Sequence, residues 1–163
     1  MENRCGWSTS NDQMIAYHDT EWGVQVHDDR LLFEMLILEG AQAGLGWSTI
    51  LKKRDNYRRA FDNFDAKKIS RYDARKVKSL LADEGIVRNR LKIAATIQNA
   101  KAFLAVQQEF GSFDKYIWQF VGGKPVQSNL KSLKEIVPRT PGSTATISLM
   151  SRLIQRPRRA SAT

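Results

Sequence analysis

Apolar residues recur at three- and four-residue spacing through the body of this chain, and no useful stretch alternates apolar with polar residues. That spacing places the apolar side chains on one face of an α-helix, whereas a half-buried strand needs a period of two. The pattern therefore predicts an all-α fold. The expected helices cover about 29–44, about 48–61, a segment opening at Asp73 with Val77, Leu80 and Leu81 inside, 89–104, and 113–121.

Aspartates precede several of these segments. Asp28 or Asp29, Asp65 and Asp73 each stand where a helix is expected to begin. A carboxylate at that position accepts hydrogen bonds from the free N–H groups of the first turn. We therefore interpret these aspartates as N-caps.

Two amphipathic helices within 74–101 are separated only by Asp83–Arg90, a connection short enough for a helical hairpin. Gly85 permits a tight backbone, and Ile86 is placed to plug the space between the helices. Arg88 and Arg90 would then point outward at the start of the second helix, beside free backbone amides. Such a helix start holds DNA phosphates without reading sequence, so a helix-hairpin-helix is predicted by shape. A basic hairpin without a DNA role is the alternative.

The chain has 163 residues, the size of one ordinary globular domain. Its 26 Lys and Arg against 17 Asp and Glu give a net charge of +9, which favours an anionic partner such as nucleic acid. No apolar run approaches the roughly 20 residues of a membrane-spanning helix, so we expect a soluble, cytoplasmic protein. One cysteine allows neither an intramolecular disulfide nor a cysteine-rich metal cage.

Residues 139–163 differ in composition from residues 1–138. They contain five arginines and no acidic residue, and so supply +5 of the net charge of +9. We predict a helical domain over 1–138 and a basic, poorly ordered tail over 139–163. The tail is either an arm that contacts nucleic acid or an aberrant end, such as a frameshift produces.

Three of the four tryptophans lie in the first fifty residues. Trp7, Tyr17 and Trp47 stand beside small residues, and Glu39 follows an apolar run. Aromatic rings around a carboxylate suit a pocket for a flat ligand, although these rings and that of Trp22 could simply be core. Glu39 is expected to face the interior, where an unpaired carboxylate is costly; a surface position is the alternative.

Several longer motifs in this region and beyond occur together and in a fixed order. They are R-C-G-W at 4–7, A-Y-H-D-x-E-W-G at 16–23, F-E-M-L-x-L-E-G-x-Q-A-G-L at 33–45, W-x-T-I-L-K-K-R at 47–54 and G-I-V-R-N-R-x-K-I at 85–93. This set closely resembles the 3-methyladenine DNA glycosylase I family over roughly residues 1–138.

The resemblance implies a helix-hairpin-helix enzyme that hydrolyses the N-glycosidic bond of N3-methyladenine in alkylated double-stranded DNA. The base is flipped out of the stack, and its positive charge favours the faces of the aromatic rings by ~1 to 2 kcal/mol per desolvated contact. Glu39 matches the family's pocket carboxylate, so it is the candidate catalytic residue. The implied sites are base-binding Trp7, Tyr17 and Trp47, and DNA-backbone contacts Gly85, Arg88, Arg90 and Lys92.

Other helix-hairpin-helix glycosylases carry an aspartate some distance after the hairpin, an arrangement this family lacks. Asp114 lies downstream of the hairpin here. Because Ser112-Phe113-Asp114 is typical of the first turn of a helix, we interpret Asp114 as structural.

The family also holds a structural zinc ion with a Cys and a His near each end of the chain. Cys5 and His18 match the first pair, whereas the second pair is absent because the only other histidine is His27. The chain therefore offers half of a tetrahedral zinc site. Three interpretations remain: an active, monomeric glycosylase, a catalytically impaired DNA-binding remnant of the family, and an unrelated helical nucleic-acid-binding module.

Overall fold

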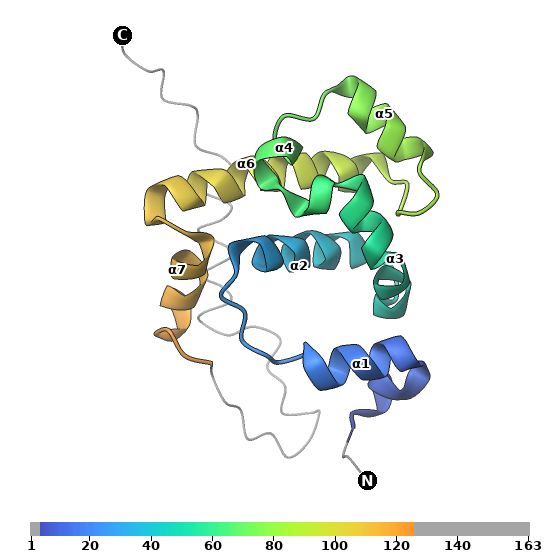
Figure 1. Ribbon diagram of the computed structural model, residues 1–163, viewed down its shortest axis with the longest axis vertical. Coiled ribbons are helices and arrows are strands. Elements are labelled where there is room, and N and C mark those ends of the chain that lie inside the picture. The colour runs from blue at the N-terminus through green and yellow to red at the C-terminus, as the bar shows by residue number, and fades with distance from the viewer. Residues whose placement is uncertain (1–3, 126–163) are drawn as a thin grey trace. The chain divides into compact units, whose positions relative to one another are not determined.

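The computed structural model describes residues 4–125, which fold entirely as helices, turns and loops (Figure 1). The helical elements are η1 (Gly6–Ser10), α1 (Asp12–Thr20), α2 (Asp29–Gln42), α3 (Trp47–Ala60), η2 (Asp62–Phe64), α4 (Ala66–Ile69), α5 (Ala74–Ala82), α6 (Arg90–Phe110), α7 (Phe113–Trp118) and η3 (Gln119–Val121). The predicted all-α class is confirmed. The predicted boundary after Pro138 and the basic tail lie outside the described residues.

The expected helices are present, with two differences. α6 continues to Phe110, beyond the predicted end near 104. η1 and α1 were not predicted, because their polar and aromatic residues form no regular apolar stripe. Within 4–125, no helix combines the length and the apolar character needed to cross a bilayer.

The predicted N-caps are confirmed for three helices. The Asp28 carboxylate accepts the N–H of Leu31 at 2.7 Å, and so caps α2. Asp65 caps α4 and Asp73 caps α5 in the same manner, each through its carboxylate oxygen. These bonds satisfy amides that have no partner inside the helix.

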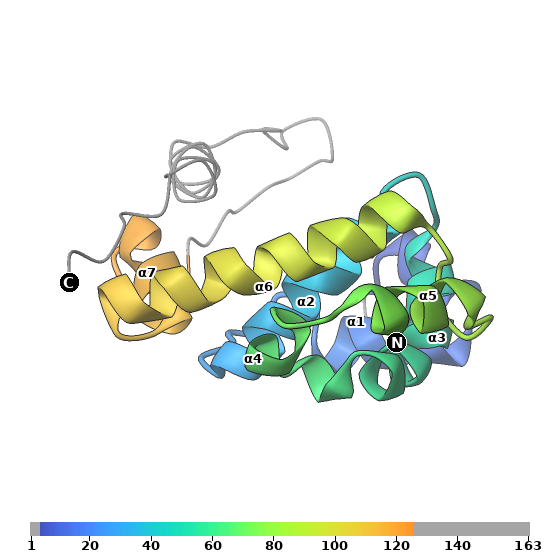
Figure 2. The ribbon, with the colours of Figure 1, turned by 90° about the horizontal axis from the view of Figure 1, so that it is seen from above.

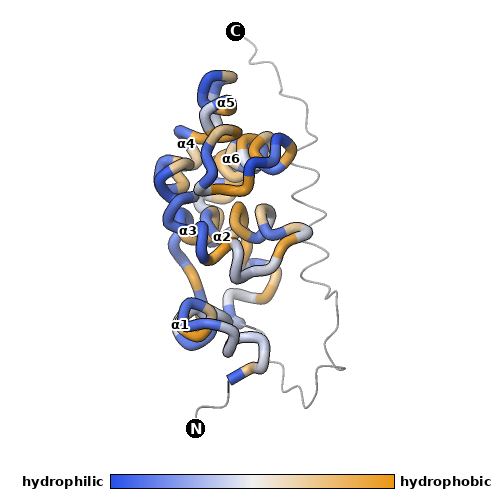
Figure 3. Tube along the Cα trace, turned by 90° about the vertical axis from the view of Figure 1, so that its right-hand side faces the viewer, coloured by the Kyte–Doolittle hydropathy of each residue, from blue (hydrophilic) through white to orange (hydrophobic). Residues whose placement is uncertain are grey.

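The chain divides into two compact units, Met1–Ala100 and Lys101–Thr163. In the first unit, α2 lies between α1 and the first half of α6 (Figure 1). Its fully buried apolar residues include Phe33 and Leu38 of α2, Ile50 of α3 and Ile69 of α4. Each such side chain contributes about 1.5–3 kcal/mol of hydrophobic stabilisation. The outer parts of α3 and α5 are hydrophilic, as the blue segments of Figure 3 show.

A buried carboxylate lies among these apolar side chains. Glu34 of α2 is fully buried, and its Oε1 accepts hydrogen bonds from Arg54 Nε at 2.6 Å and Arg58 at 2.7 Å. Arg58 Nε also donates to Oε1, and Arg30 donates to Oε2, each at 3.1 Å. Burial would raise the pKa of Glu34, but the hydrogen bonds and charges of Arg58 and Arg54 outweigh it and hold the pKa below its ordinary value. Glu34 is therefore an ionised group that ties α2 to α3.

The same network reaches the end of α1. Arg54 also donates to both carboxylate oxygens of Glu21, at 2.8 and 2.7 Å. Glu21 is the residue that follows α1, and its own N–H donates to the carbonyl oxygen of Tyr17. Through Arg54, the buried carboxylate thus holds three helices together.

The described part of the second unit contains the end of α6, α7 and η3. Phe103 and Phe113 stack with ring centroids 4.5 Å apart, and Tyr116 packs against Phe113 at 5.6 Å. The Ser112 side chain caps α7 by accepting the N–H of Lys115. Asp114 lies in the first turn of α7, which agrees with its interpretation as a structural residue.

The buried network gives a stability prediction. Replacing Glu34 with Gln removes the charge that pairs with the largely buried Arg54, and we expect a loss of about 3 kcal/mol in the free energy of unfolding. Urea denaturation followed by circular dichroism measures it. Glu84→Gln is the matched control, since Glu84 forms an exposed pair with Arg88, and its urea midpoint should stay unchanged. Equal midpoints for the two variants would contradict this role of Glu34.

Candidate active site and nucleic-acid interface

α5, the loop after it and the start of α6 form the predicted helix-hairpin-helix, seen from above beside α3 in Figure 2. Ile86 is buried at the centre of the loop, which confirms its role as the plug. Three hydrogen bonds join α3 to this loop. These join Lys53 Nζ to the Glu84 carbonyl at 2.8 Å, Asn56 Nδ2 to the Gly85 carbonyl at 3.2 Å, and the Val87 N–H to the Tyr57 hydroxyl at 3.2 Å.

Gly85 lies where a side chain does not fit. A Cβ at this position would lie 2.9 Å from Asp83 Oδ1 and 3.0 Å from Asn56 Cβ. The Gly85 N–H donates to the same Asp83 oxygen at 2.8 Å. Gly85 therefore acts by allowing the close approach of the loop to α3.

The hairpin presents cationic side chains to solvent. Arg88 and Arg90 are exposed, and Arg88 forms a surface ion pair with Glu84 at 3.3 Å. The backbone amides at the start of α6 are less available than expected, because Asn89 Oδ1 accepts the N–H groups of Leu91 and Lys92 at 2.9 and 3.1 Å. Phosphate binding at this surface would rest mainly on the two guanidinium groups.

Lys92, the remaining residue predicted to contact the DNA backbone, has hydrogen-bond partners within the protein. Its ammonium donates to the carbonyl oxygens of Ala41 and Ala43, each at 2.7 Å. The side chain is directed to the end of α2 instead of the outer face of the hairpin.

The three predicted base-binding aromatic residues lie together. The Tyr17 ring is 5.3 Å from the Trp47 ring and 6.5 Å from the Trp7 ring, measured between centroids. Tyr17 forms a small buried cluster with Met14 and Leu51, and Trp47 packs against it. Trp7 is 42% exposed, so the alternative that all these rings are core is wrong for this residue.

Glu39 is exposed, so the prediction that it faces the interior was wrong and the surface alternative is correct. The inward face of α2 carries Glu34 instead. Even so, the Glu39 carboxyl is partly shielded from water, which raises its pKa. Burial is the largest cause of the raised pKa of Tyr17, and the charge of Glu39 is the next largest, so the two side chains interact. We call Trp7, Tyr17, Trp47 and Glu39 the aromatic site.

Two features of the aromatic site escaped sequence reasoning. The Nε1 of Trp47 is a buried donor, and no residue in the described range accepts its hydrogen. Trp22 is half exposed; it stacks on the His18 ring at 5.4 Å and meets the edge of Trp7 at 5.3 Å. The motif at 16–23 contains Trp22 but does not show that its ring extends the aromatic surface.

The backbone of Cys5 lies next to the imidazole ring of His18. The Cys5 N–H donates to His18 Nε2 at 3.5 Å, and His18 Nδ1 lies 2.9 Å from a carboxylate oxygen of Asp19. Arg4 holds that carboxylate in turn. A histidine oriented by a carboxylate is usual for a zinc ligand. Among residues 4–125, however, no three potential ligands gather, so these residues do not complete a zinc site.

Comparisons with known proteins agree with this arrangement. The sequence profile described as Methyladenine glycosylase matches residues 7–155. DNA-3-methyladenine glycosylase 1 of Escherichia coli K12 is 46% identical over 142 residues, which cover 87% of this chain and 76% of that protein. DNA-3-methyladenine glycosylase of Haemophilus influenzae is 41% identical over 145 residues, covering 89% and 78%.

Solved structures give the same result. The 3-methyladenine DNA glycosylase I of Staphylococcus aureus, solved to show how it recognises 3-methyladenine, is 32% identical. It superposes with a TM-score of 0.87 over 93% of this chain and 80% of the other. The sequence profile, the two relatives and this superposition together show that the chain belongs to the methyladenine glycosylase family.

Proposed function

We propose that this chain excises N3-methyladenine from alkylated double-stranded DNA by hydrolysing the N-glycosidic bond, with Glu39 as the pocket carboxylate. Its relatives are DNA-3-methyladenine glycosylases, and the chain covers more than three quarters of their length. The observation that carries the assignment of residues is the convergence of Tyr17, Trp47 and Glu39 from α1, α3 and α2. All three belong to motifs that the relatives' family shares.

The chemistry follows from the charge of the lesion. A flipped N3-methyladenine is cationic, so the electron-rich faces of Trp7, Tyr17 and Trp47 attract it more than they attract neutral adenine. The same charge makes the base a good leaving group, and little acid catalysis is needed. Glu39 would accept hydrogen bonds from the base edge and stabilise its positive charge. Selection of the damaged base is then the main task of the protein.

The Trp47 Nε1, which has no acceptor among residues 4–125, supports this proposal. A buried N–H without an acceptor costs free energy comparable to a lost hydrogen bond, so such groups usually have a partner. A ring nitrogen of a base that meets the edge of the indole, in the plane of the Trp47 ring, could accept this hydrogen. The donor and Glu39, an acceptor, would then read two different positions on the base edge.

The hairpin would supply the DNA-backbone contacts. Arg88 and Arg90 lie on its exposed face, and Gly85 lets the loop approach α3. Contacts of this kind fix the position of the duplex without reading its sequence. We further propose that the chain acts as a monomer in the cytoplasm.

The impaired-remnant interpretation is not favoured. The family profile continues to residue 155, past the end of the resemblance expected near 138. Activity without a complete zinc site is therefore the specific expectation for this chain.

Replacement of Glu39 with Gln tests the carboxylate directly. Loss of a charge-assisted hydrogen bond and of the charge itself should weaken binding of the cationic base by about 10- to 100-fold. We expect the release of 3-methyladenine from methylated duplex DNA to fall by a similar factor in single-turnover assays. Glu109→Gln, an exposed change on α6 outside the aromatic site, is the matched control and should release the base at the native rate. Equal rates for the two variants would exclude Glu39 as the pocket carboxylate.

The raised pKa of Glu39 predicts a pH dependence. The ionised carboxylate is needed, so excision should fall as the pH decreases through a midpoint above the ordinary value of 4.5. Single-turnover rates across the acidic range give this midpoint, and circular dichroism at each pH confirms that the chain stays folded. In Glu39→Gln the inflection should vanish. An inflection that persists in the variant would assign it to another group.

Metal removal tests the half zinc site. We propose that Cys5 and His18 alone hold zinc too weakly to stabilise this 163-residue chain. The purified protein should contain far less than one zinc ion per chain by elemental analysis, and EDTA should leave its Tm unchanged. One zinc ion per chain together with a clear decrease in Tm on chelation would contradict the proposal.

A further inference from the structure

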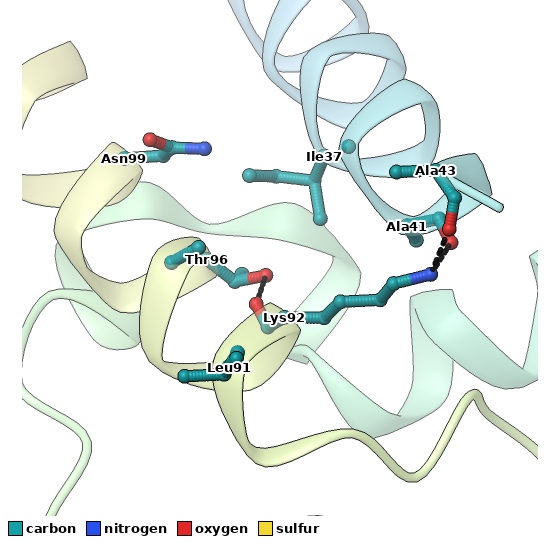
Figure 4. Close-up of a pocket in the computed structure, with 9 residues that line it drawn as sticks. Ile37, Ala41, Ala43, Leu91, Lys92, Thr96 and Asn99 are labelled. Carbon is teal, nitrogen blue, oxygen red and sulfur yellow. Dashed lines mark hydrogen bonds between the residues drawn. The ribbon is translucent and has the colours of Figure 1, made fainter.

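Lys92 forms a link between the hairpin and the end of the helix that carries Glu39. It lies in the first turn of α6, and its ammonium donates to the carbonyl oxygens of Ala41 and Ala43, each at 2.7 Å (Figure 4). Ala41 and Lys92 are 51 residues apart in the sequence. This contact therefore depends on the fold and joins two segments that carry different parts of the proposed function.

The accepting carbonyls lie where α2 ends. Helix α2 finishes at Gln42 with Ala43 as its C-cap, and the backbone of Gly44 then takes a positive φ of 79°. The last carbonyls of a helix have no partner within it, and a cation there also interacts favourably with the helix dipole. The Lys92 ammonium therefore stabilises the point at which the chain leaves α2.

That point lies between two residues of the aromatic site. Glu39 precedes Ala41 on α2, and Trp47 begins α3 four residues after Ala43. The short connection from Ala43 to Gly46 therefore joins the helix that carries the carboxylate to the helix that begins with the indole. A group that holds this connection also holds the geometry of the aromatic site.

The other end of Lys92 is fixed to the hairpin. Its backbone N–H donates to Asn89 Oδ1 at 3.1 Å, and the exposed Arg90 lies two residues before it. Side-chain packing does not join the two helices fully here, because a cavity of about 220 Å³ opens beside Lys92. It is lined by Ile37 and Gly40 of α2 and by Leu91, Ala95, Thr96 and Asn99 of α6, among others (Figure 4). The two hydrogen bonds of the Lys92 ammonium therefore connect the start of α6 to the end of α2 beside this cavity.

We propose that Lys92 is a positioning residue that couples the DNA-binding hairpin to the base-binding aromatic site, and that it is not a phosphate contact. The inference rests on the proposed function of this chain. Lys92 touches neither the base nor the reacting atoms; it acts through the backbone between Glu39 and Trp47. Its removal should loosen the aromatic site while leaving the exposed cations of the hairpin in place.

A pair of variants separates this role from phosphate binding. Lys92→Met keeps most of the aliphatic stem but removes the donor, whereas Arg88→Gln removes a cation from the exposed hairpin surface. Each is measured for binding of free 3-methyladenine by tryptophan fluorescence, for binding of methylated duplex DNA at several salt concentrations, and for single-turnover release of the base. Free base contains no phosphate, so its affinity reports on the aromatic site alone.

We expect Lys92→Met to bind the free base about tenfold more weakly, as when the binding-competent geometry of the aromatic site falls to roughly a tenth of the population, and to excise the base from DNA more slowly. Its affinity for DNA and the salt dependence of that affinity should match the native chain. Arg88→Gln should show the reverse, with native affinity for the base and a salt dependence reduced by roughly one phosphate contact. For excision of the base from methylated DNA, Lys92→Met should lower kcat more than it raises KM.

Opposite results would overturn the proposal. If Lys92→Met loses DNA affinity and salt dependence but binds the base normally, Lys92 is a phosphate contact. If only its Tm decreases, it is a structural helix cap. Should Lys92→Met fail to fold, Lys92→Gln, whose shorter side chain cannot reach both carbonyl oxygens, must lose base affinity without losing DNA affinity. A native chain that neither binds the base nor releases it would overturn the proposed function, and the coupling with it, whereas an active native chain matched by Lys92→Met overturns the coupling alone.

Discussion

The fully buried carboxylate of Glu34 is the constraint on which the first unit depends. A charge in the interior is tolerated only when its hydrogen bonds are satisfied, and three guanidinium groups meet this requirement. Because Arg54 and Arg58 belong to α3, the requirement fixes α3 against α2. Arg54 also binds Glu21, so the end of α1 follows from the same charge. Apolar packing supplies most of the stability here, whereas this network selects one arrangement of the three helices.

The three helices joined in this way each carry one residue of the aromatic site: Tyr17 on α1, Glu39 on α2 and Trp47 on α3. Glu34 and Glu39 lie five positions apart on one helix but in opposite environments. Arginines hold the pKa of Glu34 low, whereas partial loss of water, with no compensating cation among the described residues 4–125, raises the pKa of Glu39. Hydrogen bonds within the protein use the first carboxylate, whereas the second is the one proposed to bind the base.

Sequence periodicity predicted most of the helices, their aspartate caps and the hairpin, because these features depend on residues close together in the chain. It did not distinguish Glu34 from Glu39. Both follow apolar residues on a broadly apolar helix, where the phase of the inward face is imprecise. The residues that decide the matter, Arg54 and Arg58, come from another helix, so the distinction is tertiary. Lys92 shows the same limit: a lysine after a basic hairpin suggests phosphate, and only the fold shows its carbonyl partners.

The charges of the protein set two opposed requirements. A net charge of +9 attracts DNA, but it also disfavours the cationic base that the aromatic site is proposed to select. The structure reconciles them by pairing the cations nearest the site. Arg54 lies close to Tyr17, since its charge lowers the pKa of Tyr17, although burial and Glu39 raise that pKa by more. The charge of Arg54 is paired with the carboxylates of Glu34 and Glu21. The ammonium of Lys92 is directed to carbonyl oxygens at the end of α2. With Arg54 paired and the Lys92 ammonium held at carbonyl oxygens, Glu39 and the aromatic faces are the groups proposed to attract the cationic base, while Arg88 and Arg90 remain exposed on the hairpin, where phosphate contacts are proposed.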